Sequence, residues 1–223
     1  ITFEAKPGQV TAIIGSTGSG KSSIINLIPR FYDVSKGRVL VDGVDVRDYI
    51  QKDLRDKIGF VPQQALLFSG TIRDNMNFGK PNSTDEEIRS ALEVAQAARF
   101  VSKKENGFEA EVSQGGKNFS GGQKQRLAIA RALIKKPEIY IFDDSFSALD
   151  FKTDIRLRTA LKQYTKQASV IIVAQRVSSI MDADNILVLN EGKIVGQGKH
   201  QELLKKCQVY QEIVFSQMDE SEI

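Results

Sequence analysis

Residues 15–22 read Gly15-Ser16-Thr17-Gly18-Ser19-Gly20-Lys21-Ser22, which fits the pattern G-x-x-x-x-G-K-[ST]. A β-prone run precedes this stretch and a helical pattern follows it, which is the strand–loop–helix context that the pattern requires. Glycines in such a loop let backbone N–H groups point inward around phosphate oxygens, and the start of the helix adds partial positive charge. A chance Gly/Ser loop is the alternative, which these flanks disfavour. The sequence therefore predicts an α/β protein that holds the phosphates of a nucleoside triphosphate.

The loop and a distant carboxylate together predict a Mg²⁺ site. Lys21 is expected to reach the β- and γ-phosphates, and the Ser22 hydroxyl is expected to ligate the metal. Asp143 comes at the end of an apolar run, where such sites place the carboxylate that holds the metal's water shell. A solvated acidic pair, Asp143-Asp144, is the alternative here. The expected nucleotide-binding residues of the loop are Gly15, Ser16, Thr17, Gly18, Ser19, Gly20, Lys21, Ser22 and Ser23.

The alternation of strands and helices continues along the chain. Apolar strands separated by helices imply a mostly parallel sheet that is covered on both faces. The stretch from about 71 to 136 is helical in pattern, so it is expected to be an inserted helical subdomain. Strands are expected at 10–14, 38–41, 58–61, 139–142, 169–173, 186–189 and 193–195, and helices at 21–28, 85–97, 120–136, 152–164 and from 201.

Composition excludes some classes of function. The formal charge of +3 is too small for the basic footprint of a nucleic-acid-binding protein, so no nucleic-acid partner is expected. No apolar run approaches the ~20 residues that span a bilayer, and a single cysteine, Cys207, excludes an internal disulfide. His200 is the single histidine, and a structural role is expected for it because no second metal ligand is near in sequence. The acidic end, Asp219-Glu220-Ser221-Glu222, is expected to be frayed.

A second segment distinguishes among phosphate-loop proteins. It reads Phe119-Ser120-Gly121-Gly122-Gln123-Lys124-Gln125-Arg126 and closely resembles the signature segment of ATP-binding cassette (ABC) transporters. On its own it is also a well-capped helix start, since Ser120 and Gln123 fit a capping box. Other segments occur in the family's order: Gln63 (Q-loop), Ser147-Ala148-Leu149-Asp150 (D-loop), Val173-Ala174-Gln175-Arg176 (switch), and the exporter-type stretches Arg30-Phe31-Tyr32-Asp33, Val41-Asp42-Gly43-Val44-Asp45 and Leu67-Phe68-Ser69-Gly70-Thr71-Ile72.

This resemblance, which covers residues 1 to about 212, implies an architecture and a set of partners. The fold would be a P-loop NTPase core with a β-rich N-terminal part, and residues 1–223 would form one nucleotide-binding domain. ATP and Mg²⁺ would be the cofactors, with Gln63 contacting both. The signature residues Ser120, Gly121, Gly122 and Gln123, and the D-loop residues Ser147 and Asp150, would face the ATP of a second such domain, paired head to tail.

The resemblance also implies parts that lie beyond this chain. Transmembrane domains would dock through coupling helices, which places the domain on the cytoplasmic face of a membrane. Residues 111–116, flanked by 49–55 and 63–68, occupy the place where exporters make this contact, although a solvated loop is an equal alternative at 111–116. N-terminal strands, and the aromatic residue on which the family stacks adenine, are expected upstream of Ile1. Weak ATP binding is therefore expected of this chain.

Two positions depart from the family pattern. Asp144 stands where the family has a glutamate general base, and Gln175 stands where it has the switch histidine. Aspartate retracts the carboxylate by roughly 1 Å, a misplacement that can cost on the order of 10²-fold in rate. Glutamine cannot become cationic near a γ-phosphate. These changes predict a site that binds ATP but hydrolyses it slowly, as in one half of a heterodimeric exporter of drug-like substrates. A homodimer with two slow sites and a regulatory ATP-binding module are the alternatives.

Overall fold

The computed structural model describes residues 1–218, and the acidic end of the chain lies outside the described residues. The chain divides into two compact units. The sheet unit comprises Ile1–Ile58, Glu138–Asp144 and the described residues from Gln167 onward, and the helical unit comprises Gly59–Pro137 and Ser145–Lys166. The predicted helical insertion, about 71–136, falls inside the helical unit, which also takes in residues 145–166.

A mostly parallel sheet forms the centre of the sheet unit, as the sequence predicts. The strand order is β10-β9-β1-β8-β7-β4, and β4 begins at Ile58, the last residue of this part of the unit. The pairs β1–β8, β1–β9 and β7–β8 are parallel, and the pair β9–β10 is antiparallel. The strands are β1 (Val10–Gly15), β4 (Ile58–Val61), β7 (Ile139–Asp143), β8 (Ser169–Val173), β9 (Asn185–Asn190) and β10 (Lys193–Gly198), and a separate hairpin joins β2 (Leu40–Val41) to β3 (Val44–Asp45).

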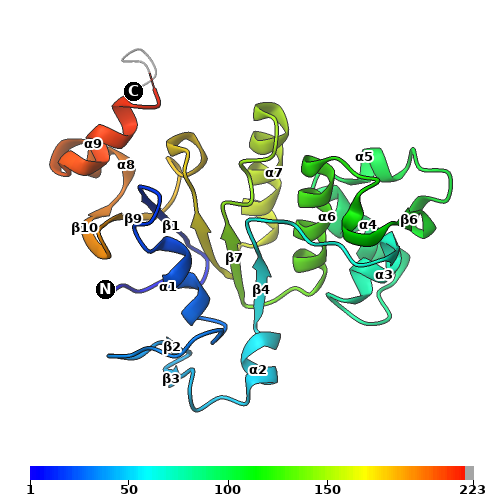
Figure 1. Cartoon of the computed structure of the whole chain (residues 1–223), viewed down its shortest axis with the longest axis horizontal. Helices are drawn as coiled ribbons and strands as arrows, with labels where there is room; N and C mark the ends of the chain where they lie inside the picture. The colour runs from blue at the N-terminus through cyan, green and yellow to red at the C-terminus, as the bar shows by residue number, and fades with distance from the viewer. Residues whose placement is uncertain (219–223) are drawn as a thin grey trace. The chain divides into compact units, whose positions relative to one another are not determined.

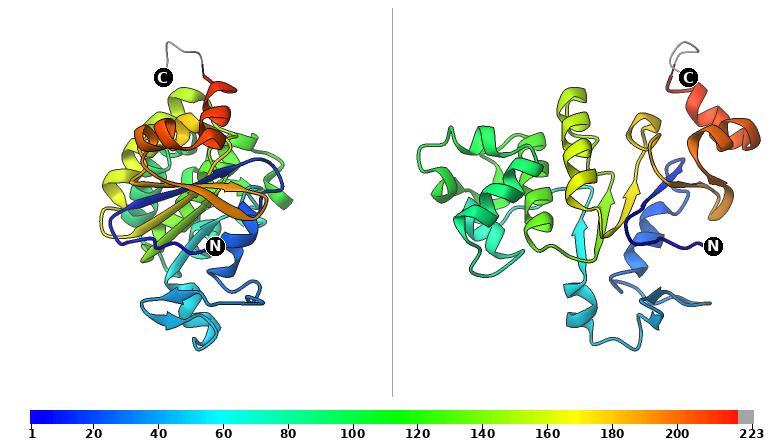
Figure 2. Two further views of the ribbon diagram at one scale, coloured as in Figure 1. Left: turned by 90° about the vertical axis from the view of Figure 1, so that its left-hand side faces the viewer. Right: turned by 180° about the vertical axis from the view of Figure 1, so that it is seen from behind.

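The central strands are buried on both faces, which explains their continuous apolar sequence. All five residues of β8 and four of the five in β7 are buried. Figure 2 shows α1 on one side of the sheet and α8 and α9 on the other, where they contact β10 and β9. This two-sided cover is the arrangement that apolar parallel strands require. The helices of the sheet unit are α1 (Lys21–Leu27), α2 (Gln51–Asp56), α8 (His200–Lys206) and α9 (Gln208–Phe215), with a short 3₁₀ turn η3 (Val177–Ser179).

The helical unit is built around α6 (Gly121–Ile134), on which eight residues are buried (Figure 1). Its neighbours within the unit include α3 and α4, and α4 also contacts α7. The remaining elements are α3 (Ile72–Asn77), α4 (Asp85–Val94), α5 (Ala98–Val101), α7 (Phe151–Tyr164), the strand pair β5 (Gly70–Thr71) and β6 (Glu111–Val112), and the 3₁₀ turns η1 (Gly107–Glu109) and η2 (Gln114–Gly116).

The structure corrects several predicted element boundaries. The helix expected from 201 onward is two helices, because Cys207 is extended (φ −120°, ψ 102°) between α8 and α9. The helix expected at 85–97 ends at Val94, and the strand expected at 38–41 is only two residues long. Three short helices, α2, α3 and α5, were not predicted. A signal for α3 exists in the sequence, since Thr71 and Asp74 form a capping box at its start.

Across residues 1–218, no helix is both long enough and apolar enough to cross a membrane.

Candidate nucleotide-binding site

Three predicted site segments of the sheet unit meet at one edge of its sheet. The strands β1, β7 and β8 are parallel neighbours, and Val173 pairs with both Ile13 and Asp143. Their carboxyl ends therefore share an edge, from which the phosphate loop, Asp144 and Gln175 all continue. In open parallel α/β sheets, ligands bind outside the carboxyl ends of the strands.

The phosphate loop has a backbone that side chains would disturb at defined positions. A Cβ atom on Gly15 would lie 2.2 Å from the carbonyl oxygen of Leu189, so only glycine fits beside β9. Gly18 and Gly20 adopt φ values of 81° and 100°, a region that favours glycine. Gly20 also caps α1 without any side-chain hydrogen bond. Ser16, Thr17, Gly18, Ser22 and Ser23 are exposed, whereas Ser19 and Lys21 are buried.

Lys21 bonds to the loop that it follows. Its Nζ donates to the carbonyl oxygens of Gly15 (2.7 Å) and Ser16 (2.8 Å), and lies 3.5 Å from Ser19 Oγ. Burial lowers the pKa of Lys21, and the charges of Asp144 and Asp143 oppose that shift. A phosphate anion in the loop would compete with these oxygens for the three N–H donors of Lys21 Nζ. The loop therefore already holds the ammonium group beside the expected phosphate position.

Ser22 and Asp143 form the pair that fits a Mg²⁺ ion. Ser22 Oγ donates to Asp143 Oδ1 at 3.2 Å, which brings a hydroxyl and a carboxylate together as hard oxygen ligands. Burial raises the pKa of Asp143, and the hydrogen bond from Ser22 opposes this. Within residues 1–218, no group of three or more His, Cys, Asp or Glu side chains could hold a metal ion. A Mg²⁺ ion at this pair would therefore need phosphate oxygens and water to complete its coordination.

The two positions that depart from the family pattern are in direct contact. Gln175 Nε2 donates to Asp144 Oδ2 at 3.1 Å, and the Asp144 N–H donates to the carbonyl oxygen of Val173 at 2.9 Å. Asp144 has a positive φ of 44°, uncommon for a residue with a side chain, and is only 8% exposed. Residues held in such strained backbone conformations cluster at active sites and ligand-binding sites. From the sequence, Asp144 and Gln175 were assigned separate roles, and this contact was not predicted.

Sequence reasoning missed one residue of this region. Gln217, just beyond α9, accepts from the Val177 N–H (2.9 Å) and donates to the Gln175 carbonyl oxygen (2.8 Å). It lies about 40 residues from both partners and belongs to no motif, so nothing in the sequence points to it.

The remaining predicted residues lie in the helical unit. Ser120 caps α6 through a capping box with Gln123, as the sequence predicts. A Cβ atom on Gly121 would meet nothing within 4 Å, whereas one on Gly122 would lie 3.1 Å from the carbonyl oxygen of Ala148 in the D-loop. The two predicted site residues of the D-loop are Asp150, which caps α7 by accepting from the Thr153 N–H (3.0 Å), and Ser147, which is exposed. Gln63 is also exposed and follows β4.

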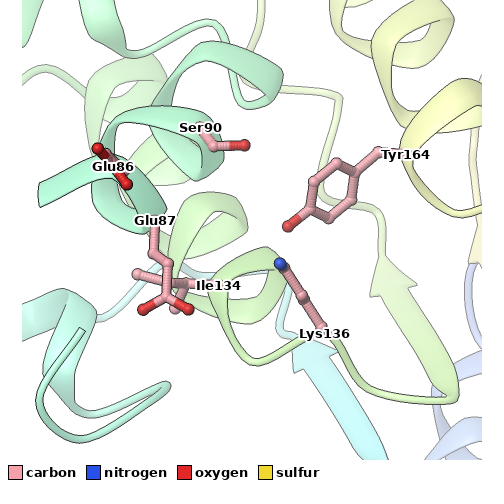
Figure 3. Close-up of a pocket in the computed structure, with 6 residues that line it drawn as sticks. All are labelled: Glu86, Glu87, Ser90, Ile134, Lys136 and Tyr164. Carbon is pink, nitrogen blue, oxygen red and sulfur yellow. The ribbon is translucent and has the colours of Figure 1, made fainter. Parts of the chain in front are cut away.

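The small cavity in Figure 3 is lined by residues other than these predicted site residues. It lies in the helical unit, and Figure 3 shows the ends of Lys136 and Tyr164 pointing toward one another across it. None of the predicted nucleotide, signature or metal residues lines it. Its full lining is Glu86, Glu87, Ser90, Ile134, Lys136 and Tyr164.

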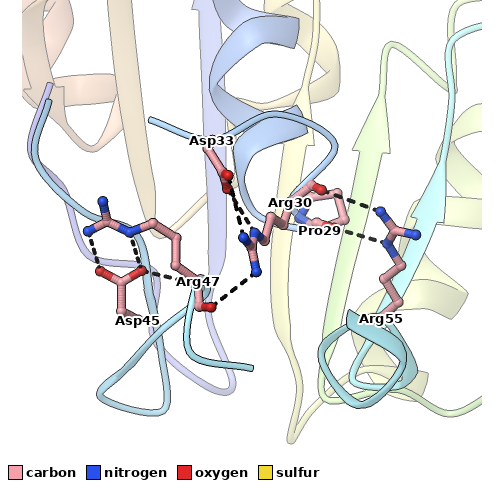
Figure 4. Close-up of polar contacts among 6 residues, drawn as sticks. All are labelled: Pro29, Arg30, Asp33, Asp45, Arg47 and Arg55. Atoms are coloured by element: carbon pink, nitrogen blue, oxygen red, sulfur yellow. Dashed lines mark hydrogen bonds and ion pairs between the residues drawn. The ribbon is translucent and has the colours of Figure 1, made fainter. Parts of the chain in front are cut away.

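A network of arginines holds the exporter-type stretch at 30–33 (Figure 4). Arg55 of α2 donates to the carbonyl oxygens of Pro29 (3.2 Å) and Arg30 (3.3 Å). Arg30, whose φ is 53°, pairs with Asp33 and donates to the carbonyl oxygen of Arg47. The neighbouring aromatic side chains of Phe31 and Tyr32 are 47% and 67% exposed. The sequence pattern identified the stretch at 30–33, but it did not predict its contacts with Arg47 and Arg55.

Comparison with known proteins is consistent with this site. A family model described as ABC transporter matches residues 1–147. An uncharacterized ABC transporter ATP-binding protein of Mycobacterium tuberculosis is 51% identical over 220 residues, which cover 97% of this chain and 38% of that protein. A Staphylococcus aureus protein, provisionally named a multidrug export ATP-binding/permease protein, is 42% identical over 213 residues, which cover 96% of this chain and 37% of that protein.

A solved structure gives the corresponding match in three dimensions. The structure of a bacterial Atm1-family ABC exporter with ATP bound aligns with a TM-score of 0.94 and 39% identity, over 98% of this chain and 38% of that one. This match confirms the predicted fold class. The chain spans less than two fifths of the length of each of these three proteins.

Proposed function

Because this chain belongs to the ABC transporter family, we propose that it is the ATP-binding domain of an exporter and that its own ATP site is slow. It binds Mg-ATP on the phosphate loop and lends its signature segment to the ATP of a second domain. The observation that supports the slow site is the hydrogen bond from Gln175 Nε2 to Asp144 Oδ2, because it joins the two side chains that differ from the family pattern.

The side chains of the sheet unit give this site its chemistry. Lys21 supplies a fixed positive charge for the β- and γ-phosphates, and Ser22 with Asp143 would hold Mg²⁺, which neutralises charge on the phosphate oxygens when bound. Asp144 is the candidate base, and it is one methylene shorter than the family's glutamate. Gln175 can orient a group by donating a hydrogen bond but cannot add positive charge. Binding is thus retained while the groups that act on water and on the γ-phosphate are weakened.

The helical unit supports a contribution to a partner's site. Gly121 is exposed with open space around it, so its backbone can be approached closely by another molecule. Backbone N–H groups at the start of α6, a helix of 14 residues, suit a phosphate. The partner domain would carry a glutamate and a histidine at the positions that Asp144 and Gln175 hold in this chain. The assembly would therefore be a heterodimer. Asp150 and Ser147 would lie at the same interface, and Gln63 would contact the nucleotide and Mg²⁺ of this chain.

The proposal extends to transport. ATP binding closes the domain pair and hydrolysis at the competent site reopens it, which drives alternating access in transmembrane domains docked near residues 111–116. Export of small, hydrophobic or drug-like substrates is proposed because of the name of the Staphylococcus aureus relative. The domain would then lie on the cytoplasmic face of the membrane.

The test is Mg-ATP binding and turnover in the full transporter that contains this chain, after the partner's general base has been removed. The wild-type chain is expected to bind Mg-ATP with only slow turnover, and Lys21→Ala is expected to bind about 10- to 100-fold more weakly, since it removes charge-assisted hydrogen bonds. Lys52→Ala is the control, because Lys52 is exposed and pairs only at the surface with Asp56. Restoring Asp144→Glu together with Gln175→His is expected to return turnover.

Other outcomes point to other functions. Brisk turnover by the wild-type chain with the partner's base removed contradicts the slow site. A wild-type transporter that binds ATP, yet shows no turnover even with the partner intact, indicates a regulatory module that gates by occupancy. A second copy of this chain as the only partner indicates a homodimer with two slow sites.

A further inference from the structure

The side chain of Gln217 clamps the backbone of the segment that carries Gln175. Its Oε1 accepts from the Val177 N–H at 2.9 Å, and its Nε2 donates to the Gln175 carbonyl oxygen at 2.8 Å. One amide group thus bonds to positions i and i+2 of an extended segment, whose middle residue, Arg176, has φ −98° and ψ 127°. A carboxamide can do this because it has both an acceptor and donors on one plane.

We infer that Gln217 is a positioning residue for Gln175, and that the end of α9 thereby sets where the switch side chain points. Two anchors fix the pair of groups at the site. The Asp144 N–H donates to the carbonyl oxygen of Val173, and Gln217 fixes the backbone of Gln175 two residues later. With both backbones held, Gln175 Nε2 lies 3.1 Å from Asp144 Oδ2. This inference rests on the proposed role of Gln175, but its test does not depend on ATP.

A merely structural role, in which Gln217 ties α9 to the sheet unit, fits the contacts less well. Tyr210 and Val214 of α9 are fully buried, and Gln211 Nε2 donates to the Leu204 carbonyl oxygen of α8 at 2.6 Å. The helix is therefore anchored without Gln217, which lies two residues beyond its last residue, Phe215, and is exposed. An exposed amide adds little to global stability, so the effect of its two bonds is local to residues 175–177.

The test compares amide hydrogen exchange at Val177 and the side-chain amide resonance of Gln175 by NMR, using this chain without nucleotide. Gln217→Ala is expected to speed exchange at Val177 roughly three- to tenfold, the loss of one hydrogen bond, and to shift the Gln175 side-chain resonance. Gln217→Glu keeps an acceptor for Val177 but lacks the donor. It is therefore expected to retain protection at Val177 while the Gln175 resonance still shifts.

Gln211→Ala is the matched control, because it removes a glutamine-to-carbonyl bond of the same helix away from the switch segment. It is expected to leave Val177 and Gln175 unchanged. Unchanged signals in Gln217→Ala overturn the inference, and so does a uniform loss of protection across β8 and β9, which would indicate a structural tie. Mg-ATP binding by the full transporter is measured separately and keeps the two proposals distinct: absent binding there counts against the proposed function alone.

Discussion

Among single residues, Gly15 and Gly121 differ in why a glycine is present. A Cβ atom on Gly15 would lie 2.2 Å from the Leu189 carbonyl oxygen and 2.8 Å from Ser19 Oγ, whereas one on Gly121 would meet nothing within 4 Å. Gly15 is therefore required by packing within this chain, because β1 and β9 approach too closely for a methyl group. Gly121 has no such requirement, so any need for it must come from a molecule that approaches the signature segment.

A pair of alanine variants tests this difference. Gly15→Ala is expected to lower the free energy of unfolding by about 1–3 kcal/mol, the usual cost of overpacking against atoms that cannot move. Gly121→Ala is expected to stay within about 0.5 kcal/mol of the wild-type chain, since alanine suits the first turn of a helix. Urea denaturation measures both. Equal destabilisation by the two variants would contradict the packing argument.

The helix α2 shows at the scale of the element how a short segment can position a distant loop. Its six residues include Arg55, which bonds to the carbonyl oxygens of Pro29 and Arg30 and lies over the Phe31 ring at 5.4 Å. Arg30 has a left-handed backbone (φ 53°), which is unfavourable without outside contacts. The arginine of α2 therefore stabilises the bend that presents Phe31 and Tyr32 at the surface.

Removing this arginine is expected to loosen the bend. Arg55→Ala should destabilise the chain by about 1–2 kcal/mol, because two hydrogen bonds and a ring contact are lost. Lys52→Ala, on the same helix, removes an exposed ion pair with Asp56 and should cost at most about 0.5 kcal/mol. Urea denaturation, with limited proteolysis to locate any new cleavage near residues 29–33, separates the two. A larger loss in Lys52→Ala than in Arg55→Ala would refute this reading.

At the scale of the whole molecule, one buried histidine links folding to pH. His200 starts α8, its Nδ1 lies 2.8 Å from the Tyr210 hydroxyl of α9, and its Nε2 is buried without a hydrogen-bond partner among residues 1–218. Burial lowers the pKa of His200 from its usual 6.5, with the charge of Asp182 opposing, and burial raises the pKa of Tyr210 to about 12. The folded chain therefore favours the neutral imidazole more than the unfolded chain does.

The sign of the pH effect follows from that shift. The stability contributed by a neutral His200 is complete above pH 6.5, and it is lost as the pH falls from there toward the lowered pKa of the folded state, because only the unfolded chain gains the proton in that window. Denaturant unfolding at pH 7.5, 6.5 and 5.5 should show a steeper loss for the wild-type chain than for His200→Gln. Parallel pH profiles for the two proteins would exclude His200 as the source.

The fold class, and those parts of the nucleotide site that depend on local spacing, could be predicted from the order of residues alone. The loop from Gly15 to Ser22 and the aspartate after an apolar strand are local patterns, and a parallel sheet necessarily brings the ends of such strands to one edge. The capping box at Ser120 likewise needs only residues three apart, and the structure has it as predicted. The roles of Asp144 and Gln175 in catalysis stay predictions.

The distant residues that support these segments became visible once the chain was folded. The contact of Asp144 with Gln175, the two bonds of Gln217 to the switch backbone and the hold of Arg55 on residues 29–30 join positions that are 25 or more residues apart. Gly196 of β10 also packs closely on Cys207, since a Cβ on Gly196 would lie 2.6 Å from the Cys207 sulfur atom. Periodicity and propensity describe each segment alone, whereas such contacts arise when segments pack together, and no single stretch of sequence encodes them.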